Sequence, residues 1–372
     1  MDKVIVSVTN DLATDQRVFK ECKTLMELGF EVVLLGRILP NSMPIERPYT
    51  TKRFRLLFNK GPLFYAEINT RIFFYLMVHH ANILLANDLD TLAANFVASR
   101  LKRIPLVYDS HEYFTGVPEL QGRPFAKKVW EIIEAFIFPK LKYVYTVNKT
   151  IADIYIKKYK VDVKVVRNVA MKWRPLEKKS RQDLGLPLDK KIIIFQSAGI
   201  NIQRGMEELV EAMQFIENTL LLIIGNGDAL PVLKQMVQDL RLEEKVSFYP
   251  KMYFDDMMNY TSVADLGICI DKDTNLNYKY SLPNKIMEYI MAGIPILTTP
   301  LVEIKPIIEK YKVGYFLDSY DPKIISKTIA NVLNNTEGLK ICAENTKAAA
   351  NDLCWENEEN VIKSMFFKIG TE

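Results

Sequence analysis

The chain has 372 residues, of which 49% are hydrophobic and 25% charged, and this composition is typical of a globular protein. The length is too great for one ordinary core and predicts two domains. The four cysteines lack the spacing of a disulfide framework or a zinc site, so we expect neither, and they fit a reducing cytoplasm. They are Cys22, Cys269, Cys342 and Cys354.

The net charge of +4 conceals an asymmetry between the two halves. Residues 1–174 carry a balance of +10 and residues 175–372 a balance of −6. The excess of cations predicts that the N-terminal half meets an anionic surface. We expect no signal peptide, because the opening residues continue at once into a strand-like segment, Val4–Val8.

The first half alternates apolar runs with helical patterns. Expected strands cover residues 3–8, 31–35, 82–86, 105–108 and 143–147, with helices at 15–28 and 89–102 and an aromatic helix near 63–81. This alternation predicts a parallel sheet covered on both faces. Ligands bind beyond the carboxyl ends of such strands, where the chain carries Asp11, Asp88, His111 and Glu112.

Two segments of this half bear on membranes. Glu67 and Arg71 interrupt the apolar stretch from Leu63 to Ala81, so it is not expected to span a bilayer. Residues 123–160 mix lysines with aromatic side chains. That mixture suits either a helix lying on anionic lipid or a helix packed on the sheet with its lysines in water. The charge of the whole half favours membrane contact.

A second alternation follows a polar connector at residues 169–190. Strands are expected at 191–195, 220–224, 246–248, 266–269 and 294–298, with helices at 205–215, 230–240 and 254–264. The pattern predicts a second doubly wound sheet. The tail from Leu353 to Phe367 forms an amphipathic helix that either packs on its own domain or crosses back to the first.

Glycine-rich loops follow two strands of this second domain. Gly225 and Gly227 lie between a strand and a helix, where glycine can bring the backbone close to a ligand, although a plain tight turn explains them equally well. Gly199 begins a similar loop that ends at Arg204, whose guanidinium can grip a phosphate with two hydrogen bonds.

The segment from Ser281 to Thr298 predicts a loop, a short helix and a buried strand. Asn284 is expected to cap the helix and Gly293 to end it in a left-handed turn. Lys285 and Glu288 share one helical face, as an ordinary surface ion pair or as ligand-binding groups. Together with Arg204, Lys285 places two cations at one sheet edge and favours a diphosphate site.

Three titratable groups of the first domain have competing interpretations. Carboxylates flanking His111 would raise its basicity and orient its ring, which favours a functional role over a structural one. Asp88 and Asp90 have the spacing of a metal-binding Asp-x-Asp, but N-capping of the helix at 89–102 explains them better. No metal site is expected.

With these residues in place, the chain resembles the retaining glycosyltransferases of family 4, which have the GT-B fold. The resemblance covers the full length. It depends on these motifs: Val8–Arg17, Leu25–Gly29, Tyr108–Glu112, Arg204–Gly205, Gly225–Gly227, Ala264–Leu266, Pro283–Tyr289, Gly293–Pro295 and the tail at Trp355. It implies an α/β protein with two Rossmann-like domains facing a cleft.

The resemblance implies a nucleotide-sugar on the second domain and an acceptor on the first. Arg204 and Lys285 would hold the diphosphate, Glu288 the ribose hydroxyls, and the strip containing Tyr249 the base. His111 would lie near the transferred sugar. The implied donor-binding residues are Gly199, Arg204, Gly225, Gly227, Tyr249, Asn284, Lys285 and Glu288; the catalytic ones are His111 and Glu288; and those on the acceptor side are Asp11, Arg17, Asp88 and Glu112.

The chain departs from the family pattern at two points. The first of two glutamates that the family carries would fall at Tyr280, and Asp271 or Asp273 is a possible substitute. A basic residue usual near the start of the Gly199 loop is also missing, which leaves Arg204 alone there.

Four segments are therefore expected. They are an acceptor-side domain at 1–168, a linker at 169–190, a donor-binding domain at 191–350 and a helix at 351–372 that returns to the first domain.

We expect a cytoplasmic glycosyltransferase, peripheral at the inner face of the membrane, that needs no metal or other cofactor and does not bind nucleic acid. It would transfer a sugar from a nucleotide-sugar to a lipid-linked or polysaccharide acceptor with retention. Cations and helix N-termini would stabilise the charge on the nucleoside diphosphate that leaves. A nucleotide-sugar 2-epimerase of the same fold and a non-catalytic binding partner are the alternatives.

Overall fold

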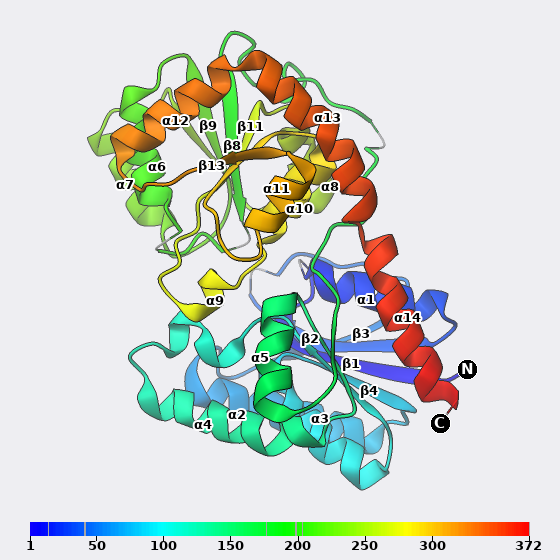
Figure 1. Cartoon of the computed structure of the whole chain (residues 1–372). Coiled ribbons are helices and arrows are strands. Elements are labelled where there is room, and N and C mark those ends of the chain that lie inside the picture. Colours follow the sequence, from blue (N-terminus) through cyan, green and yellow to red (C-terminus); the bar gives the residue numbers. More distant parts are fainter. Residues whose placement is uncertain (14, 41, 176, 198, 203, 372) are drawn as a thin grey trace. The chain divides into compact units, whose positions relative to one another are not determined.

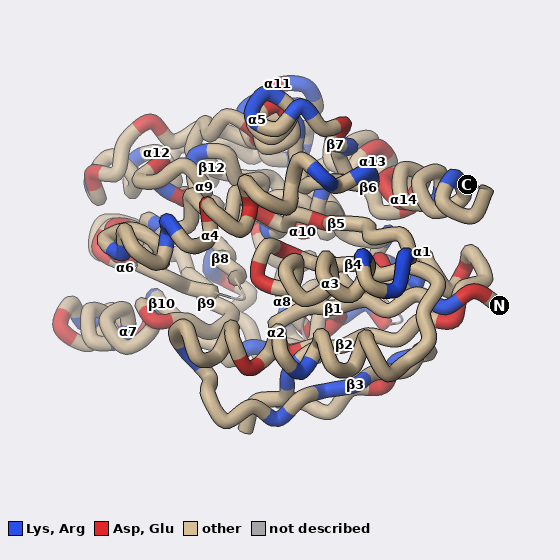
Figure 2. Tube along the Cα trace, turned by 90° about the horizontal axis from the view of Figure 1, so that it is seen from below, with Lys and Arg blue, Asp and Glu red and all other residues tan. Residues whose placement is uncertain are grey.

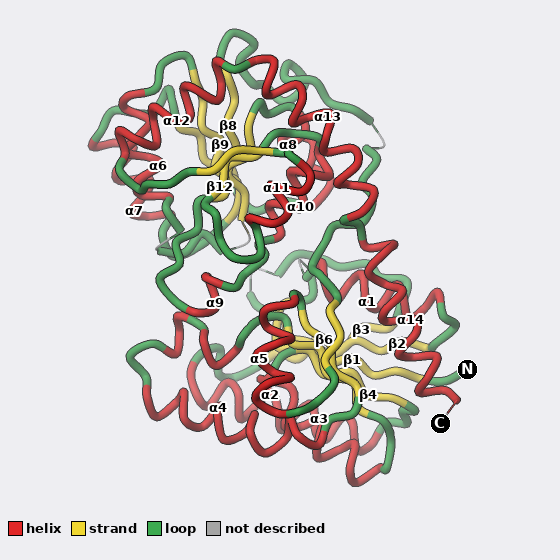
Figure 3. Tube along the Cα trace, viewed as in Figure 1, coloured by secondary structure: helices red, strands yellow, loops and turns green. Residues whose placement is uncertain are grey.

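A computed structural model of the chain describes residues 1–13, 15–40, 42–175, 177–197, 199–202 and 204–371, without the side chain of Pro118. It contains two compact units (Figure 1), each with a parallel sheet between layers of helices (Figure 3). The first comprises Met1–Asn168, Asn275–Asn277 and Glu356–Glu372, and the second Val169–Thr274 and Tyr278–Trp355.

Seven parallel strands build the first sheet, in the order β3-β2-β1-β4-β5-β6-β7. They are β1 (Lys3–Asp11), β2 (Glu31–Ile38), β3 (Thr50–Arg55), β4 (Ile83–Asn87), β5 (Leu106–Ser110), β6 (Tyr143–Thr146) and β7 (Val163–Val165). Its helices are α1 (Gln16–Glu27), α2 (Gly61–Val78), α3 (Leu89–Lys102), α4 (Pro124–Ile137) and α5 (Lys149–Tyr159). The edge strands β3 and β7 were not predicted, because one is rich in charge and the other has three residues.

Local signals set the ends of the first helix as expected. The carboxylate of Asp15 accepts a hydrogen bond from the backbone N–H of Val18, which is an N-cap. Gly29 follows the helix with a φ of 87°, a left-handed conformation that suits glycine. The chain then enters β2, which pairs in parallel with β1.

Six parallel strands build the second sheet, in the order β10-β9-β8-β11-β12-β13. They are β8 (Lys191–Ser197), β9 (Thr219–Gly225), β10 (Val246–Tyr249), β11 (Leu266–Cys269), β12 (Ile296–Thr298) and β13 (Gly314–Phe316). The helices are α6 (Met206–Ala212), α7 (Leu230–Asp239), α8 (Phe254–Ser262), α9 (Leu276–Lys279), α10 (Asn284–Ala292), α11 (Lys305–Tyr311), α12 (Pro322–Asn334) and α13 (Thr336–Asp352). Its core includes fully buried residues of β8, β9 and β11, such as Ile193, Phe195, Leu221, Ile223 and Ile268.

The last helix, α14 (Trp355–Thr371), packs on the first unit. The hydroxyl of Thr24 donates to Glu359 at 2.8 Å, and the rings of Phe30 and Phe366 meet edge to face at 5.7 Å. Figure 1 shows this helix, in red, beside α1. The chain therefore returns to its first unit after completing the second.

None of the helices in the described ranges combines the length and apolar character that crossing a bilayer requires. The expectation that the stretch around α2 does not span a membrane agrees with this finding.

Candidate functional site

Two cations of the second unit converge on one buried carboxylate. The ammonium nitrogen of Lys285 lies 3.1 and 3.2 Å from the two carboxylate oxygens of Asp271, and Nη1 of Arg204 lies 3.4 Å from one of them. The side chains of Asp271 and Lys285 are only 1% and 4% exposed. Two positive groups facing one negative group leave an excess of positive charge where water screens it poorly, which suits an anionic ligand.

Each of the two cations lies over an aromatic ring. Lys285 lies over the ring of Phe195 at 4.4 Å, and the guanidinium of Arg204 lies over Tyr278 at 4.7 Å. Although burial lowers the pKa of Arg204, Asp271 raises it above its ordinary value. Nε of Arg204 is buried and has no hydrogen-bond partner among the described residues.

The helix that carries Lys285 begins differently from the prediction. Pro283, in an extended conformation, occupies the N-cap position, and Asn284 is the first helical residue, so the expectation that Asn284 caps the helix is wrong. Proline has no side chain that can accept from the first N–H groups of a helix. Gly293 ends the helix at a φ of 82°, as predicted.

Glu288, one turn after Lys285, is held from the end of β8. The side-chain amide of Gln196 donates to Glu288 at 2.5 Å, and its carbonyl oxygen accepts from the hydroxyl of Thr261 at 2.6 Å. Gln196 is fully buried while Glu288 is half-buried. Gln196 therefore fixes the carboxylate of Glu288, a positioning role that the sequence analysis missed because the two residues lie 92 positions apart.

The glycine-rich loops pack against each other. A Cβ on Gly225 would lie 1.9 Å from the carbonyl oxygen of Ser197, and one on Gly227 would lie 2.2 Å from that of Ile200. At Gly199 the nearest atom to such a Cβ would be 3.7 Å away, in Asn201. Gly225 and Gly227 are thus required by packing between two loops, a reason not considered from the sequence. Ala198 and Gln203, in the same predicted loop, lie outside the described residues.

Two other donor-side expectations have different outcomes. Tyr249, at the end of β10, is half-buried, and the centroid of its ring lies 4.9 Å from that of the Tyr260 ring. Asp271, a suggested substitute for the missing glutamate at position 280, is buried in its ion pairs with Lys285 and Arg204. It cannot serve as a free sugar contact, whereas Asp273 is exposed.

In the first unit, His111 lies between the carboxylates of Asp88, which follows β4, and Asp109, which lies in β5. Its Nε2 is 2.9 Å from Oδ2 of Asp109, and its Nδ1 is 3.3 Å from Oδ2 of Asp88. The backbone N–H of His111 also donates to Asp88 at 2.7 Å. The predicted gathering of Asp88 and His111 at this sheet edge is therefore present in the structure.

Arg17 lies beneath this group and does not reach the surface. Its guanidinium donates two hydrogen bonds of 2.7 Å to Asp109 and one of 3.0 Å to the carbonyl of Val166, and Arg17 is 3% exposed. Although burial lowers the pKa of Arg17, Asp109 raises it, so its charge persists. The expectation that Arg17 borders the acceptor must be revised, because its donors are directed into the protein.

Asp88 and Asp90 lie at the start of α3, where the sequence favoured N-capping over a metal site. Asp88 occupies the N-cap position of α3 at a φ of 59°, but its side chain makes no capping hydrogen bond within the described residues and binds His111 instead. Asp90 accepts from the hydroxyl of Thr9 at 2.5 Å. Burial raises the pKa of Asp90 to about 6.

Asp11 and Glu112 are also held by neighbours at this edge. The carboxylate of Asp11 accepts from Arg53 at 2.9 Å and from the hydroxyl of Ser42 at 2.5 Å. Glu112 accepts from the amide of Asn277 at 2.8 Å. Both remain half-buried, and together with Asp88 and His111 they form what we call the polar rim of this sheet edge.

Three side chains of the first unit come close enough to be considered as metal ligands, namely Glu21, Asp109 and His111. Their donor set does not suit a cation. Arg17 occupies both oxygens of Asp109, and the hydroxyl of Tyr145 donates to Glu21 at 3.2 Å. A positive guanidinium in the group would also repel a metal ion.

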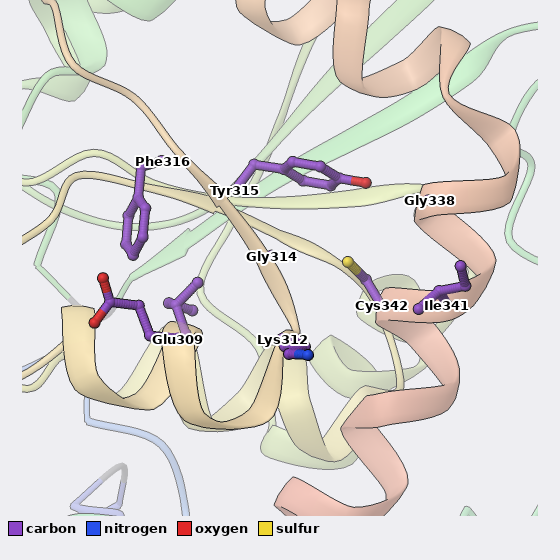
Figure 4. Close-up of a pocket in the computed structure, with 9 residues that line it drawn as sticks. Glu309, Lys312, Gly314, Tyr315, Phe316, Gly338, Ile341 and Cys342 are labelled. Atoms are coloured by element: carbon purple, nitrogen blue, oxygen red, sulfur yellow. The ribbon is translucent and has the colours of Figure 1, made fainter.

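A surface pocket of about 320 Å³ lies elsewhere on the second unit, between α11, β13 and α13 (Figure 4). Its lining includes Glu309, Lys312, Tyr315, Ile341 and Cys342. None of the predicted site residues contributes to it. The pocket has one acid and one base on its rim and no excess of charge to draw an anion.

Comparisons with known proteins agree on a family. A model described as Glycosyltransferase Family 4 matches residues 16–169, and one described as Glycosyl transferases group 1 matches residues 177–349. An uncharacterized glycosyltransferase of Methanocaldococcus jannaschii is 21% identical over 348 residues, which cover 89% of this chain and 82% of that protein.

Solved structures share the fold at low sequence identity. Sucrose-phosphate synthase from Thermosynechococcus elongatus has a TM-score of 0.80 at 15% identity, with 100% of both chains covered. Anabaena HepE in complex with UDP-glucose has a TM-score of 0.71 at 13% identity, again over 100% of both chains. With its two Rossmann-like units, the chain has the GT-B fold and belongs to the family 4 glycosyltransferases.

Proposed function

We propose that this glycosyltransferase takes its sugar from a nucleotide-sugar held on the second unit. The observation that carries the proposal is the pair of cations, Lys285 and Arg204, around the single carboxylate of Asp271. A diphosphate would supply the missing negative charge. HepE, which has the same fold, was solved with UDP-glucose.

The remaining donor contacts follow from the placement of the site residues. The N-terminus of α10 carries Lys285 in its first turn and Glu288 one turn later, so a phosphate and a ribose hydroxyl could be bound by one helix. Tyr249 would lie along the base, beside Gly199, Gly225 and Gly227 in the loops. In this scheme the fixed cations stabilise the charge that develops on the departing nucleoside diphosphate without a metal ion.

The acceptor would bind at the polar rim of the first unit, around Asp11, Asp88, His111 and Glu112. We propose a lipid-linked or polysaccharide acceptor and transfer of a hexose with retention. Support for a lipid-linked acceptor comes from the outer surface of the same unit, since its helices are suited to a membrane.

Helices α2, α3 and α4, which lie along one side of the first sheet in Figure 1, expose apolar side chains. These are Leu63, Phe74, Val78, Val97, Leu101, Phe125, Val129, Ile132 and Phe136. Exposed cations accompany them (blue in Figure 2), among them Arg100, Arg103, Lys127, Lys128 and Lys140. Apolar side chains that can enter lipid, bordered by cations, suit the headgroup region of an anionic leaflet.

The first test is incubation of the protein with a panel of labelled nucleotide-sugars and lipid-linked acceptors. We expect transfer in the wild type and a loss of at least about 100-fold in Glu288→Ala, as is typical when a key polar contact to the reacting complex is removed. Glu344→Ala, at an exposed position of α13, is the matched control and should retain full activity. An epimerised sugar, or binding without turnover, would favour one of the two alternatives instead.

The second test measures binding to vesicles with and without anionic lipid. Binding should require the anionic lipid and fall as salt rises, because salt screens surface charges beyond about 10 Å. Phe125→Ser combined with Phe136→Ser should weaken it, whereas Phe215→Ser, exposed on the second unit, should not. Binding that persists unchanged at high salt would contradict the electrostatic part of the proposal.

A further inference from the structure

The ring of His111 is surrounded by hydrogen-bond acceptors. Its Nε2 faces Oδ2 of Asp109 and Oδ1 of Asn87, each at 2.9 Å, and its Nδ1 faces Oδ2 of Asp88 at 3.3 Å. The amide nitrogen of Asn87 donates to the carbonyl of Ser7, which directs its oxygen toward the ring. A neutral imidazole carries one N–H, so one of its two nitrogens would then face a carboxylate with a lone pair. With Asp88 and Asp109 both ionised, only the doubly protonated ring satisfies both sides.

The charges around the ring support the same state. Arg17 holds Asp109 through two hydrogen bonds, and although burial raises the pKa of Asp109, Arg17 and His111 keep it below its ordinary value. Burial and the neighbouring Asp109 raise the pKa of Glu21 well above its usual range, so Glu21 adds little negative charge. Two cations, Arg17 and His111, then face two acidic groups. The pKa of Asp109 stays below its ordinary value, whereas burial raises the pKa of Asp88 well above its ordinary value and His111 acts to lower it.

The wider surroundings of His111 are acidic as well. Asp90 at the start of α3 and Glu112 beside the ring both interact with it electrostatically. Although burial alone lowers the pKa of His111, Asp88 and Asp109 raise it to about 10, against the opposing effect of Arg17. The ring is therefore expected to keep its proton throughout the physiological range.

We propose that Arg17, Asp109 and Asp88 hold His111 as a permanent imidazolium, which serves the transferase as a fixed positive charge and not as a proton acceptor. Arg17 and Asp109 are positioning residues that act through the ring. With both nitrogens protonated, His111 has no lone pair for the proton of an acceptor hydroxyl. Its charge is available to an oxygen of the substrate at this sheet edge, a role that rests on the proposed function, whereas the protonation state does not.

Histidine NMR on the full chain tests the protonation state without any substrate. The chain has three histidines, so His79→Gln and His80→Gln assign the spectrum. We expect the nitrogen and carbon shifts of His111 to remain those of an imidazolium at pH 8.5. A neutral ring at that pH, including one whose proton has moved to Asp88, would overturn the proposal.

Substitution of the carboxylates tests the cause. Asp88→Asn is suited to this, because asparagine tolerates the positive φ of position 88 and that side chain is 17% exposed. We expect the midpoint of His111 to fall by about 1–3 pH units. Asp109→Asn should lower it further, and Asp153→Asn, at an exposed position of α5, should leave it unchanged. An unaltered midpoint in both site variants would contradict the assignment.

The pH dependence of transfer tests the role. If His111 acted as a base, turnover would rise with pH around 6.5, the ordinary pKa of a histidine. We expect no such rise in the wild type. His111→Gln should reduce turnover at every pH, and His111→Lys should recover part of it. A rise of wild-type turnover with pH around 6.5, or full activity in His111→Gln, would refute the role of a fixed charge. Failure of the donor proposal would differ, since the wild type would then show no turnover while its NMR spectrum still reported the imidazolium.

Discussion

The two polar clusters at the sheet edges differ in their charge balance. In the first unit, the cations Arg17 and His111 are matched by carboxylates, and the side chains of Arg17 and Asp109 are almost fully buried. In the second, Arg204 and Lys285 share one carboxylate among the residues that the structure describes, that of Asp271. The carboxyl edges of two similar sheets can therefore carry clusters of different kinds. In the first unit the charges are balanced within the protein, whereas the second unit has an excess of positive charge that an anionic ligand can balance.

The loops that carry these clusters also differ in construction. In the second unit, Gly225 and Gly227 let two backbones approach more closely than any side chain would allow. In the first unit, side-chain hydrogen bonds and ion pairs hold the loops together. Asp88 adopts a positive φ, and its carboxylate lies against His111. Backbone packing supports the one cluster, and charge pairing supports the other.

The largest effect is expected from Lys285→Met in the second cluster. Removal of the ammonium leaves the buried carboxylate of Asp271 with Arg204, at 3.4 Å, as its one remaining cation among the described residues. Breaking a buried ion pair costs about 3–5 kcal/mol. We expect that loss in urea denaturation, together with loss of sugar transfer.

The double variant Lys285→Met with Asp271→Asn separates the two consequences. This variant also removes the negative charge of Asp271, which Lys285→Met leaves without its main partner. It should therefore recover most of the stability but none of the sugar transfer. Recovery of transfer in the double variant would show that the cation excess is not what binds the donor, and the contrast between the clusters would lose its functional meaning.

A smaller effect, of the opposite sign, is expected from Asp90→Asn at the edge of the first cluster. Burial raises the pKa of Asp90 to about 6, so the folded state favours the protonated acid. The stability from this group is complete below pH 4 and is lost as the pH rises through 6. The amide that replaces the carboxyl group carries no charge. The variant should therefore be as stable as the wild type at pH 4 and more stable by about 3 kcal/mol at pH 7.

Thermal unfolding of both proteins at pH 4 and pH 7.5 measures this difference. Asp153→Asn, at an exposed position, should shift neither midpoint. If the wild type instead became more stable relative to the Asp90→Asn variant as the pH rises, the ionised carboxylate would be stabilised by the fold. The charge balance of this cluster would then extend to Asp90.

Gly227→Ala tests the backbone packing of the second unit. Its new methyl group would lie 2.2 Å from the carbonyl oxygen of Ile200, and overpacking of this kind costs about 1–3 kcal/mol. Gly199→Ala, with its nearest neighbour at 3.7 Å, is the matched control and should change stability by less than about 0.5 kcal/mol. Equal urea midpoints for the two variants would remove packing as the reason for Gly227.

Much of the fold followed from local patterns, whereas parts of the site did not. The alternation of strands and helices predicted both parallel sheets, and strand ends identified Asp88, His111 and Gly225 as edge residues. The three-residue strand β13 was missed, because so short a segment carries no periodic pattern. Glu21 was missed too, although it lies four residues after Arg17 on the same helix, a spacing that could have identified it.

By itself, the sequence determined where strands, helices and left-handed turns occur, since these depend on neighbours within a few residues. Only the tertiary structure decided which charges cancel. Arg17 meets Asp109 across 92 positions, and Arg204 meets Asp271 across 67. The energy of such pairs depends on their separation and on the exclusion of water, and both quantities exist only once the sheets have formed.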